Sequence, residues 1–494
     1  ASGPFDPLTS LAQIPPKDPA VYAAISKADT IGVFQIESRA QMAMLPILKP
    51  RKFYDLVVEV GIVRPGPIQG KMVHPYLRRR TGEEAVSYPH ACLKPILERT
   101  LGVPLFQEQV MQIAIVGAGY SPGEADQLRR DMAAWRKHGR LESHRERLRA
   151  GFHRRGIDSE FSERLFQQIL GFGEYGFPES HAASFALLVY ASAWLKVHHP
   201  CAFACALLNS QPMGFYSAGS IIRDAQKHGV EVRPICVAAS EHDCTIELPP
   251  SALPALRLGL RQVRGLTRGG SEALLGARTQ RPFQHWDDFI TRCKLKRNEL
   301  DALAEVGALS CFETSRREAL WRLRAPRDRD LFLGQAIEAV SPIGLPPLSR
   351  AEQLTLDYAS QGFSLDDHPM RHLRKRLAKR RVQRAEDQTR WRRGQQVTVA
   401  GVVLCRQRPM TSSGIVFITL EDETGVLNLV VYQRIYERYL LAARHAGLLL
   451  ARGRVDRRGD VVHVQARYLE RLEGPLAESD GPQEPLRLRS RDFH

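Results

Sequence analysis

The chain has 494 residues, a formal net charge of +16 and 43% hydrophobic residues. This length predicts three or four domains, because single domains usually hold about 100–200 residues. The hydrophobic content excludes a mostly disordered chain. No stretch approaches the roughly 20 apolar residues of a membrane-spanning helix. The 8 cysteines are scattered, which favours reduced thiols and a cytoplasmic setting over a disulfide framework.

The positive charge points to a polyanionic partner. Lys and Arg total 70 against 54 Asp and Glu, and arginine pairs bidentately with phosphate and stacks on bases. A GC-rich genome, which favours arginine codons, would give the same composition. Local motifs therefore have to decide between the two explanations.

The first half of the chain predicts a helical domain. Residues 1–50 open with prolines and hold an alternating apolar segment, and residues 51–235 predict one domain of about 200 residues. Apolar side chains recur there at intervals of three and four in Phe161–Ile169 and Phe185–Trp194, the period of a helix.

The second half predicts a change from helices to strands. Residues 236–310 hold a strand-containing junction and two compact helical units, 256–278 and 286–309. Residues 311–394 predict a basic linker, whose Arg371–Arg393 run either grips DNA or forms a solvated helix. Residues 395–472 predict the strands Val397–Leu404, Val416–Leu420, Leu427–Tyr432 and Val461–Leu469. The polar tail, 473–494, predicts a flexible segment.

Three motifs suit phosphate chemistry. The glycine-rich segment 171–181 ends in Ser180 and His181 at a predicted helix start, where backbone N–H groups and the positive helix end can face a phosphate. The alternative is a tight loop in which Ser180 only caps the helix.

The other two motifs are basic. Arg129 and Arg130 are adjacent on a predicted helix and point about 100° apart, so only one can lie squarely toward a ligand. Prolines around Gly66 stiffen a loop that presents Arg64 and Lys71, which suits contacts to a nucleic-acid backbone. A solvated helix face and a structural turn are the respective alternatives.

In this order and spacing the motifs resemble the fingers domain of bacterial DNA polymerase III alpha subunits. The resemblance runs from about residue 20 to 310, resumes near 395–470, and is carried by Gly32–Arg39, Arg64–Pro67, Leu105–Met111, Asp126–Arg130 and Tyr175–His181. It implies a palm–fingers junction at 1–50 and fingers at 51–235. It also implies that Arg129, Arg130, Ser180 and His181 hold the triphosphate of the incoming nucleotide. Phosphoryl transfer depends mostly on positioning and charge neutralisation, which arginines and helix N-termini supply.

Finer details resemble the error-prone, damage-inducible branch. They lie in Glu174–Ala186, Leu208–Tyr216 and Ser490–His494. Replicative members tend to carry Lys where this chain has Glu179, and a small residue where it has Asp131. Residues 311–394 show no clear match to the clamp-binding peptide of replicative members.

The later regions resemble DNA-binding modules. The two helical units resemble tandem helix-hairpin-helix elements, in which Gly265 offers a backbone N–H to a DNA phosphate. The second hairpin, at Gly307, is degenerate, and a simple packed hairpin is the alternative there. The strand region resembles an OB fold, with Arg406, Arg408 and Phe417 as predicted contacts to single-stranded DNA. Because its face is poor in aromatic residues, a purely protein-contacting barrel stays open.

Polymerase chemistry needs carboxylates that hold two metal ions about 4 Å apart. Asp328-Arg-Asp330 follows no predicted strand, and Glu421-Asp-Glu423 predicts a solvated turn. Cys201 and Cys205 predict core thiols rather than metal ligands. We therefore predict no catalytic and no metal-ligating residue in this chain. In the resembling family the palm precedes this region, so Mg²⁺ would bind in the full-length enzyme through residues absent here.

The fold class predicted is multidomain: mainly α fingers and tandem helix-hairpin-helix, then a small all-β OB barrel. The function predicted is the nucleotide- and DNA-holding C-terminal half of an error-prone DNA-directed DNA polymerase for translesion synthesis, inactive alone. A noncatalytic DNA-binding or scaffold protein is the alternative, and a nuclease would need a His/Asp cluster that the sequence does not show. Predicted partners are primed or single-stranded DNA, deoxynucleoside triphosphates, other mutagenesis proteins and, indirectly, the sliding clamp, with no membrane.

Overall fold

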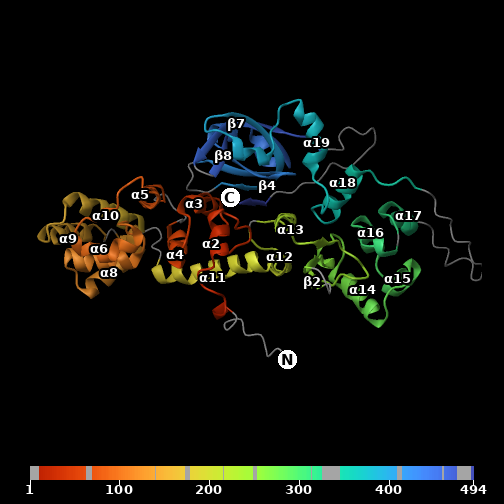
Figure 1. Ribbon diagram of the computed structural model, residues 1–494, viewed down its shortest axis with the longest axis horizontal. Coiled ribbons are helices and arrows are strands. Elements are labelled where there is room, and N and C mark those ends of the chain that lie inside the picture. Colours follow the sequence, from red (N-terminus) through yellow and green to blue (C-terminus); the bar gives the residue numbers. More distant parts are fainter. Residues whose placement is uncertain are drawn as a thin grey trace, which may run out of the picture. The chain divides into compact units, whose positions relative to one another are not determined.

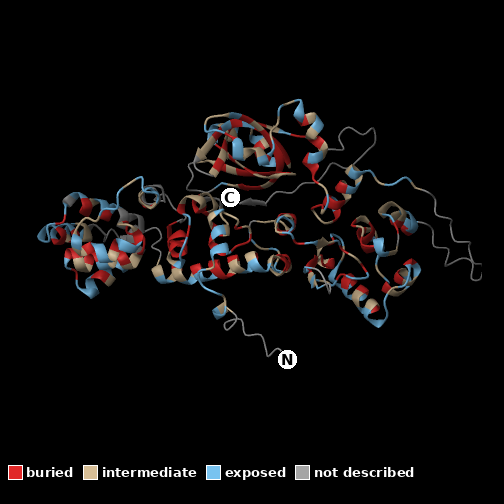
Figure 2. Ribbon diagram, viewed as in Figure 1, coloured by how far each residue is buried: buried red, intermediate tan, exposed pale blue. Residues whose placement is uncertain are grey.

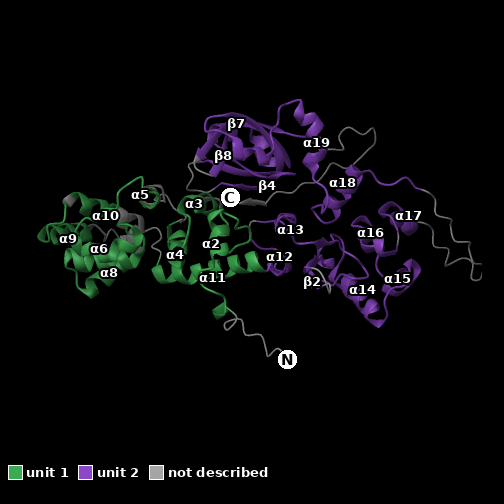
Figure 3. Cartoon of the chain, viewed as in Figure 1, with its two compact units in different colours: residues 1–198 green, residues 199–494 purple. Residues whose placement is uncertain are grey.

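The computed structural model describes residues 11–62, 69–138, 141–172, 178–214, 216–248, 253–312, 314–324, 345–408, 414–458, 461–474 and 491–493. The chain forms two compact units, residues 1–198 and 199–494 (Figure 3). In the described residues, no helix is both long enough and apolar enough to cross a membrane.

The described part of the first unit is helical (Figure 1). Its α-helices are α2 (Pro19–Ser26), α3 (Arg39–Leu48), α4 (Phe53–Ile62), α5 (Gln69–Thr81), α6 (Lys94–Leu97), α7 (Gln107–Ala118), α8 (Pro122–His138), α9 (Leu141–Arg154), α10 (Ser159–Phe172) and α11 (Glu179–His198). Two short 3-10 turns, η1 (Ala91–Leu93) and η2 (Glu98–Thr100), flank α6. The helices predicted at 161–169 and 185–194 are confirmed within α10 and α11.

Local sequence explains where these helices begin and end. Ser38 and Gln41 form a capping box at the start of α3, which satisfies amide groups that have no partner within the helix. Gly119 ends α7 with a φ of 69°, a conformation that glycine adopts without steric cost. Helices α7 to α10 then share one apolar core built around Leu128, Phe152 and Phe166.

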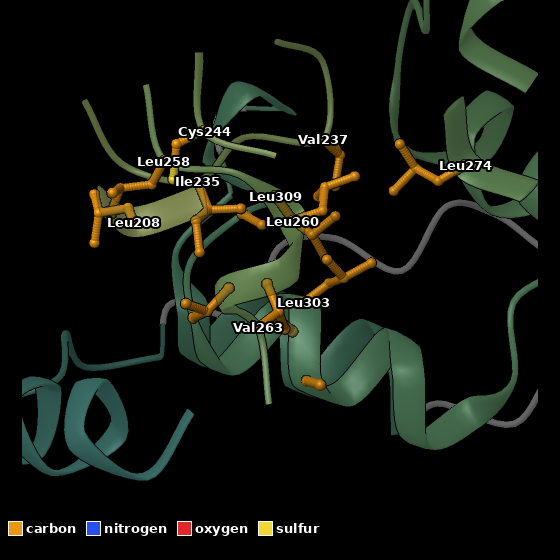
Figure 4. Packing of buried hydrophobic residues seen from close by; sticks show 14 of the residues in the cluster. Leu208, Ile235, Val237, Cys244, Leu258, Leu260, Val263, Leu274, Leu303 and Leu309 are labelled. Atoms are coloured by element: carbon orange, nitrogen blue, oxygen red, sulfur yellow. The ribbon is translucent and has the colours of Figure 1, made fainter. Parts of the chain in front are cut away.

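The second unit begins with helices around a small sheet. Its elements up to residue 324 are α12 (Pro200–Asn209), α13 (Ala218–Lys227), β1 (Val232–Arg233), β2 (Thr245–Glu247), β3 (Ala255–Arg257), η3 (Leu260–Gln262), α14 (Arg268–Gln280), α15 (Trp286–Cys293), α16 (Arg297–Glu305), η4 (Ser310–Phe312) and α17 (Arg316–Arg324). The sheet order is β1-β3-β2. One apolar core joins α12 to the helical hairpins: Leu208, Val263 and Leu303 belong to it (Figure 4). Helices α12 and α13, which the sequence analysis assigned to the fingers, thus pack with the hairpins.

The predicted OB barrel is confirmed. Its strands are β4 (Gln396–Gln407), β5 (Val416–Asp422), β6 (Gly425–Val431), β7 (Leu448–Arg458) and β8 (Val461–Arg471). They pair in the order β5-β6-β8-β7-β4, and β4 pairs again with β5, which closes the barrel. Helices α20 (Gln433–Arg438) and α21 (Leu440–His445) connect β6 to β7.

Two regions differ from the sequence analysis. The predicted linker holds α18 (Arg350–Ser360), α19 (Pro369–Ala378) and η5 (Ala385–Arg390). Met370, Leu373 and Leu377 of α19 are buried with barrel residues, so this helix is not fully solvated. Figure 2 shows buried and exposed stretches along the second unit. In the predicted flexible tail, β9 (Arg491–Phe493) pairs in parallel with Cys405–Gln407 of β4.

Candidate nucleotide and nucleic-acid interface

Helix α8 presents two arginines that share one carboxylate. Arg129 donates to Asp126 Oδ1 at 2.9 Å, and Arg130 lies 2.6 Å from Asp126 Oδ2. The two side chains converge, contrary to the predicted divergence, because positions i+3 and i+4 both lie one turn above Asp126. Their side chains are 44% and 66% exposed, so both remain open to solvent.

The two arginines favour the ionised form of the shared carboxylate. Hydrogen bonds from Arg129 and then Arg130 lower the pKa of Asp126. The next acidic residue, Asp131, is buried and lies 3.0 Å from His144 Nε2 on α9. Asp131 therefore stabilises the packing of α8 on α9 and does not compete for the arginine pair. The result is two cations held together at a solvent-facing turn.

The start of α11 is already occupied by carboxylates. The Glu179 N–H, at the first residue of the helix, donates to Glu108 Oε2 at 2.9 Å. Tyr54 donates its hydroxyl proton to Glu179 Oε1 at 2.8 Å, and Arg99 stacks 4.2 Å from the centre of the Tyr54 ring. Burial, followed by the hydrogen bond to Glu179, raises the pKa of Tyr54.

Ser180 and His181 lie in the first turn of this helix. Ser180 is exposed at the second helical position, so it does not act as the cap that the sequence suggested. The His181 ring packs against Phe185, with 4.1 Å between ring centres. Residues 173–177 of the glycine-rich segment lie outside the described residues.

Of the predicted loop contacts, Arg64 lies outside the described residues. Lys71 lies in α5, where its side chain is not described.

The first helical hairpin has an available amide. Gly265 has a φ of +97°, and an added Cβ would lie 3.3 Å from the Ala302 Cβ, so glycine fits where a larger residue would be strained. The described part of the chain gives the Gly265 N–H no hydrogen-bond acceptor. The Arg264 N–H donates to Ser360 O, so α18 braces this hairpin.

The second hairpin is built differently. The Gly307 N–H donates to Ala304 O, and the Ala308 N–H donates to Leu303 O. These bonds close the end of α16, so the Gly307 amide is already used.

On the barrel, the prediction that Arg406 contacts DNA is corrected. Arg406 is 7% exposed, and its guanidinium donates to the carbonyls of Ala443 at 2.6 Å and Ala446 at 2.5 Å. These bonds stabilise the segment between α21 and β7. By contrast, Arg408 is exposed and lies 5.2 Å from the centre of the Tyr436 ring, and Phe417 is half-buried on β5.

Comparisons with known proteins agree with this geometry. Residues 6–156 match the bacterial DNA polymerase III alpha subunit finger domain, 229–319 a helix-hairpin-helix motif, and 397–472 an OB-fold nucleic acid binding domain. The chain is 53% identical, over 98% of its length, to the error-prone DNA polymerase of Alkalilimnicola ehrlichii, of which it covers 47%. The corresponding proteins of Pseudomonas aeruginosa and Anaeromyxobacter dehalogenans are 52% and 51% identical, each over 98% of this chain and over 46% and 42% of their own lengths.

The chain belongs to the bacterial DNA polymerase III alpha subunit family. It spans about half the length of the curated relatives that it matches. Its relatives' names fit the error-prone branch that the sequence suggested.

The sequence predicted that Glu421, Asp422 and Glu423 lie in a solvated turn. That prediction is wrong, because these carboxylates form largely buried ion pairs. Glu421 accepts from Arg223 Nε at 2.7 Å. Arg374 donates to Asp422 Oδ2 at 2.6 Å and to Glu423 Oε1 at 2.5 Å. The three acids therefore stabilise the barrel against α13 and α19.

The acidic groups that the structure describes were compared with the needs of a shared metal ion, one unit at a time. Within each unit taken separately, the described residues hold no cluster of three His, Cys, Asp or Glu side chains close enough to share an ion. Asp328 and Asp330 lie outside the described residues. Cys201 and Cys205 lie in the apolar core of the second unit, as predicted, and burial raises the pKa of both thiols.

The sequence analysis missed the residues that surround Glu179. Glu108 lies within the matched segment Leu105–Met111, but nothing local indicates that it reaches a helix start 71 residues away. Tyr54 is 125 residues from Glu179. Only the packing of the helices reveals these contacts.

Proposed function

We propose that this chain is the nucleotide- and DNA-holding part of an error-prone DNA-directed DNA polymerase that acts in damage-induced mutagenesis and translesion synthesis. The observation that carries the proposal is the order of its parts: fingers, helix-hairpin-helix and OB barrel in one chain, with relatives named error-prone DNA polymerase. The proposed protein is cytoplasmic. Other mutagenesis proteins would connect it to the sliding clamp.

The proposed nucleotide site centres on Arg129 and Arg130. Two exposed guanidiniums on one turn supply the charge neutralisation that a triphosphate needs, and Asp126 keeps them oriented. Ser180 and His181 would add hydrogen bonds from the first turn of α11. Because Glu108 and Glu179 make that helix start acidic, the arginines carry most of the positive charge in this proposal.

The proposed DNA contacts lie on the second unit and on the α5 region. The Gly265 N–H would bind a phosphate without reading a base, and Arg408 and Phe417 would contact a single strand on the barrel. Arg64 and Lys71 would add backbone contacts.

The metal-binding carboxylates are proposed to lie in a part of the polymerase that this chain does not contain. When bound, two Mg²⁺ ions would activate the primer hydroxyl and stabilise the leaving pyrophosphate. We expect the 494-residue chain alone to leave a primer unextended, and the longer protein encoded by the gene to extend it. Primer extension on an undamaged and a lesion-containing template measures both. Extension by the short chain would refute its proposed lack of catalytic residues.

DNA binding by the chain itself gives a second test. Phosphate contacts release counterions, so each one adds about −0.9 to the slope of log affinity against log salt on duplex DNA. We expect primed DNA to bind with a steep slope in a fluorescence anisotropy titration. An affinity that does not change with salt would contradict a phosphate-dominated interface.

A further inference from the structure

A row of alternating arginines and tyrosines lies on the side of the barrel formed by α20, β7 and β8. Arg438 lies 5.6 Å from the centre of the Tyr439 ring, and Arg452 lies 5.4 Å from that of Tyr468. The two tyrosine rings meet edge to face, 5.2 Å apart. We call these four residues the tyrosine–arginine platform.

Both arginines of the platform have donors to offer. Neither guanidinium has a hydrogen-bond or ion-pair partner within the described ranges, and both side chains are exposed. This sets them apart from Arg406 and Arg374, whose guanidiniums donate to protein carbonyls or carboxylates. A guanidinium that is stacked on a ring but otherwise unpaired can bind a phosphate while a base stacks beside it.

The carboxylate that Tyr468 contacts is paired with an arginine, whereas Glu437, next to Arg438 in the chain, accepts a hydrogen bond from Gln433. Tyr468 donates its hydroxyl proton to Glu470 Oε2 at 2.9 Å, and Arg380 donates to both oxygens of the same carboxylate. The helices and strands α20, α21, β7 and β8 carry further exposed cations: Arg434, Arg444, Arg454 and Arg467. An anionic strand would therefore meet net positive charge along this side of the barrel.

The outward side of β5 beyond Phe417, the predicted contact on this strand, is covered by protein. Ile418 and Leu420 face the barrel core, so Thr419 and Glu421 point outward by the alternation of a strand. Yet Thr419 is 2% and Glu421 5% exposed, and Arg223 of α13 binds Glu421. A strand of DNA cannot reach side chains that protein already covers.

We propose that the tyrosine–arginine platform is the surface of the barrel that binds single-stranded DNA. Bases stack against Tyr439 and Tyr468, while Arg438 and Arg452 contact the flanking phosphates. The cation–π contact between Arg408 and the Tyr436 ring extends the surface. The inference rests on the proposed function that this chain holds DNA, and it assigns that role to residues outside β5.

The test uses the full 494-residue chain and a dye-labelled oligothymidine of about 16 nucleotides, the upper site size of one OB fold. Each lost stacking contact is expected to weaken binding about 5- to 150-fold, so Tyr439→Ala and Tyr468→Ala should each fall in this range. Tyr468→Phe keeps the ring and should bind like the parent. Arg438→Gln and Arg452→Gln change exposed side chains only, so they preserve the test if an alanine variant fails to fold. Each should weaken binding and reduce the salt slope by about 0.7.

The matched control is Trp321→Ala on α17, which removes an aromatic side chain that is 50% exposed outside the barrel and should leave affinity unchanged. A parent chain that binds oligothymidine while all four platform variants bind equally well would overturn the platform but not the proposed function. A loss of oligothymidine affinity that is confined to Phe417→Ala on β5 would also overturn the platform but not the proposed function. A parent chain that binds no single-stranded DNA would overturn the platform and count against the proposed function. Photocrosslinking of iododeoxyuridine oligonucleotides to Tyr439 or Tyr468, mapped by mass spectrometry, is the expected positive result.

Discussion

The turn of α8 and the end of β5 are built from the same residue types and behave in opposite ways. On α8, one exposed carboxylate holds two exposed arginines, Arg129 and Arg130. At the end of β5, the largely buried acids Glu421, Asp422 and Glu423 hold Arg223 and Arg374.

Solvent exposure explains the difference. An ion pair in water contributes little to stability, so a ligand phosphate can replace the carboxylate at small cost. A buried pair has already lost its hydration, so removing one partner leaves an uncompensated charge. The first arrangement suits ligand binding, and the second suits holding α13 and α19 on the barrel.

The largest expected effect is at the end of β5. Arg374→Ala leaves Asp422 and Glu423 without their partner and should destabilise the barrel by about 3–5 kcal/mol. Hydrogen exchange of the β4–β8 amides measures this locally. Arg371→Ala on the same helix, whose side chain is 54% exposed, should cost no more than about 1 kcal/mol. Equal losses in the two variants would contradict the distinction.

Two arginines at the end of β4, one inside the strand and one just after it, sharpen the same comparison. Arg406→Ala leaves the carbonyls of Ala443 and Ala446 without their donor and should cost about 1–3 kcal/mol of barrel stability. Arg408→Ala should keep stability and weaken oligothymidine binding. Thermal unfolding and fluorescence anisotropy separate the two effects. A stable Arg406→Ala variant with reduced DNA affinity would restore Arg406 as a contact.

Glu59, a buried acid in the fingers, has no arginine partner among the residues that the structure describes. Glu59 on α4 is fully buried, and neither of its carboxyl oxygens has a hydrogen-bond partner in the described chain. Burial raises the pKa of Glu59 well above its ordinary value of 4.5.

Glu59 therefore makes stability depend on pH. Above the unfolded-state pKa, the unfolded chain ionises Glu59 while the folded chain keeps the proton, so the free energy of unfolding falls by up to about 1.4 kcal/mol per pH unit. This loss continues until the pH reaches the folded-state pKa. Glu59→Gln removes it, so the variant should gain stability over the parent as pH rises from about 5 to 8. Urea unfolding of both proteins across this range is the measurement. A stability difference that stays constant with pH would show that the carboxyl is not buried in its neutral form.

The smallest effect is expected at Asp126. Asp126→Asn removes the charge that pairs with two exposed arginines and should change the free energy of unfolding by no more than about 1 kcal/mol. Thermal unfolding checks this. A loss as large as that of Arg374→Ala would mean that the α8 turn is structural.

Local sequence predicted most of the barrel but missed β7. Strand β6 alternates between buried and half-buried residues, which is the signal that the sequence carries, whereas nearly all of β5 is buried. In β7, Leu449 and Ala451 face the barrel core while Leu448 and Leu450 pack with α19. Because both faces are covered there, residues 448–451 form a continuous apolar run without alternation, and the rest of the strand is mostly polar.

The site shows the same limit. Asp126 and its arginines lie within one helical turn, so their pairing follows from spacing. Glu421 and Arg223 are 198 residues apart, and Arg374 is 48 residues from Asp422. Nothing near Glu421 in the chain shows that an arginine buries it, so a solvated turn was the natural interpretation.

The most direct test of the account is nucleotide incorporation by the full-length polymerase of which we propose that this chain is a part. Arg129→Ala and Arg130→Ala should each lower kcat/KM for the incoming nucleotide about 10- to 150-fold, the loss of one charge-assisted hydrogen bond, while DNA affinity stays near that of the parent. Arg164→Ala is the matched control, since the Arg164 side chain is also exposed, at 62%, and pairs with Glu160 one turn away on α10. Its kcat/KM should match the parent. Unchanged kcat/KM in both α8 variants would remove the arginine pair from the nucleotide site.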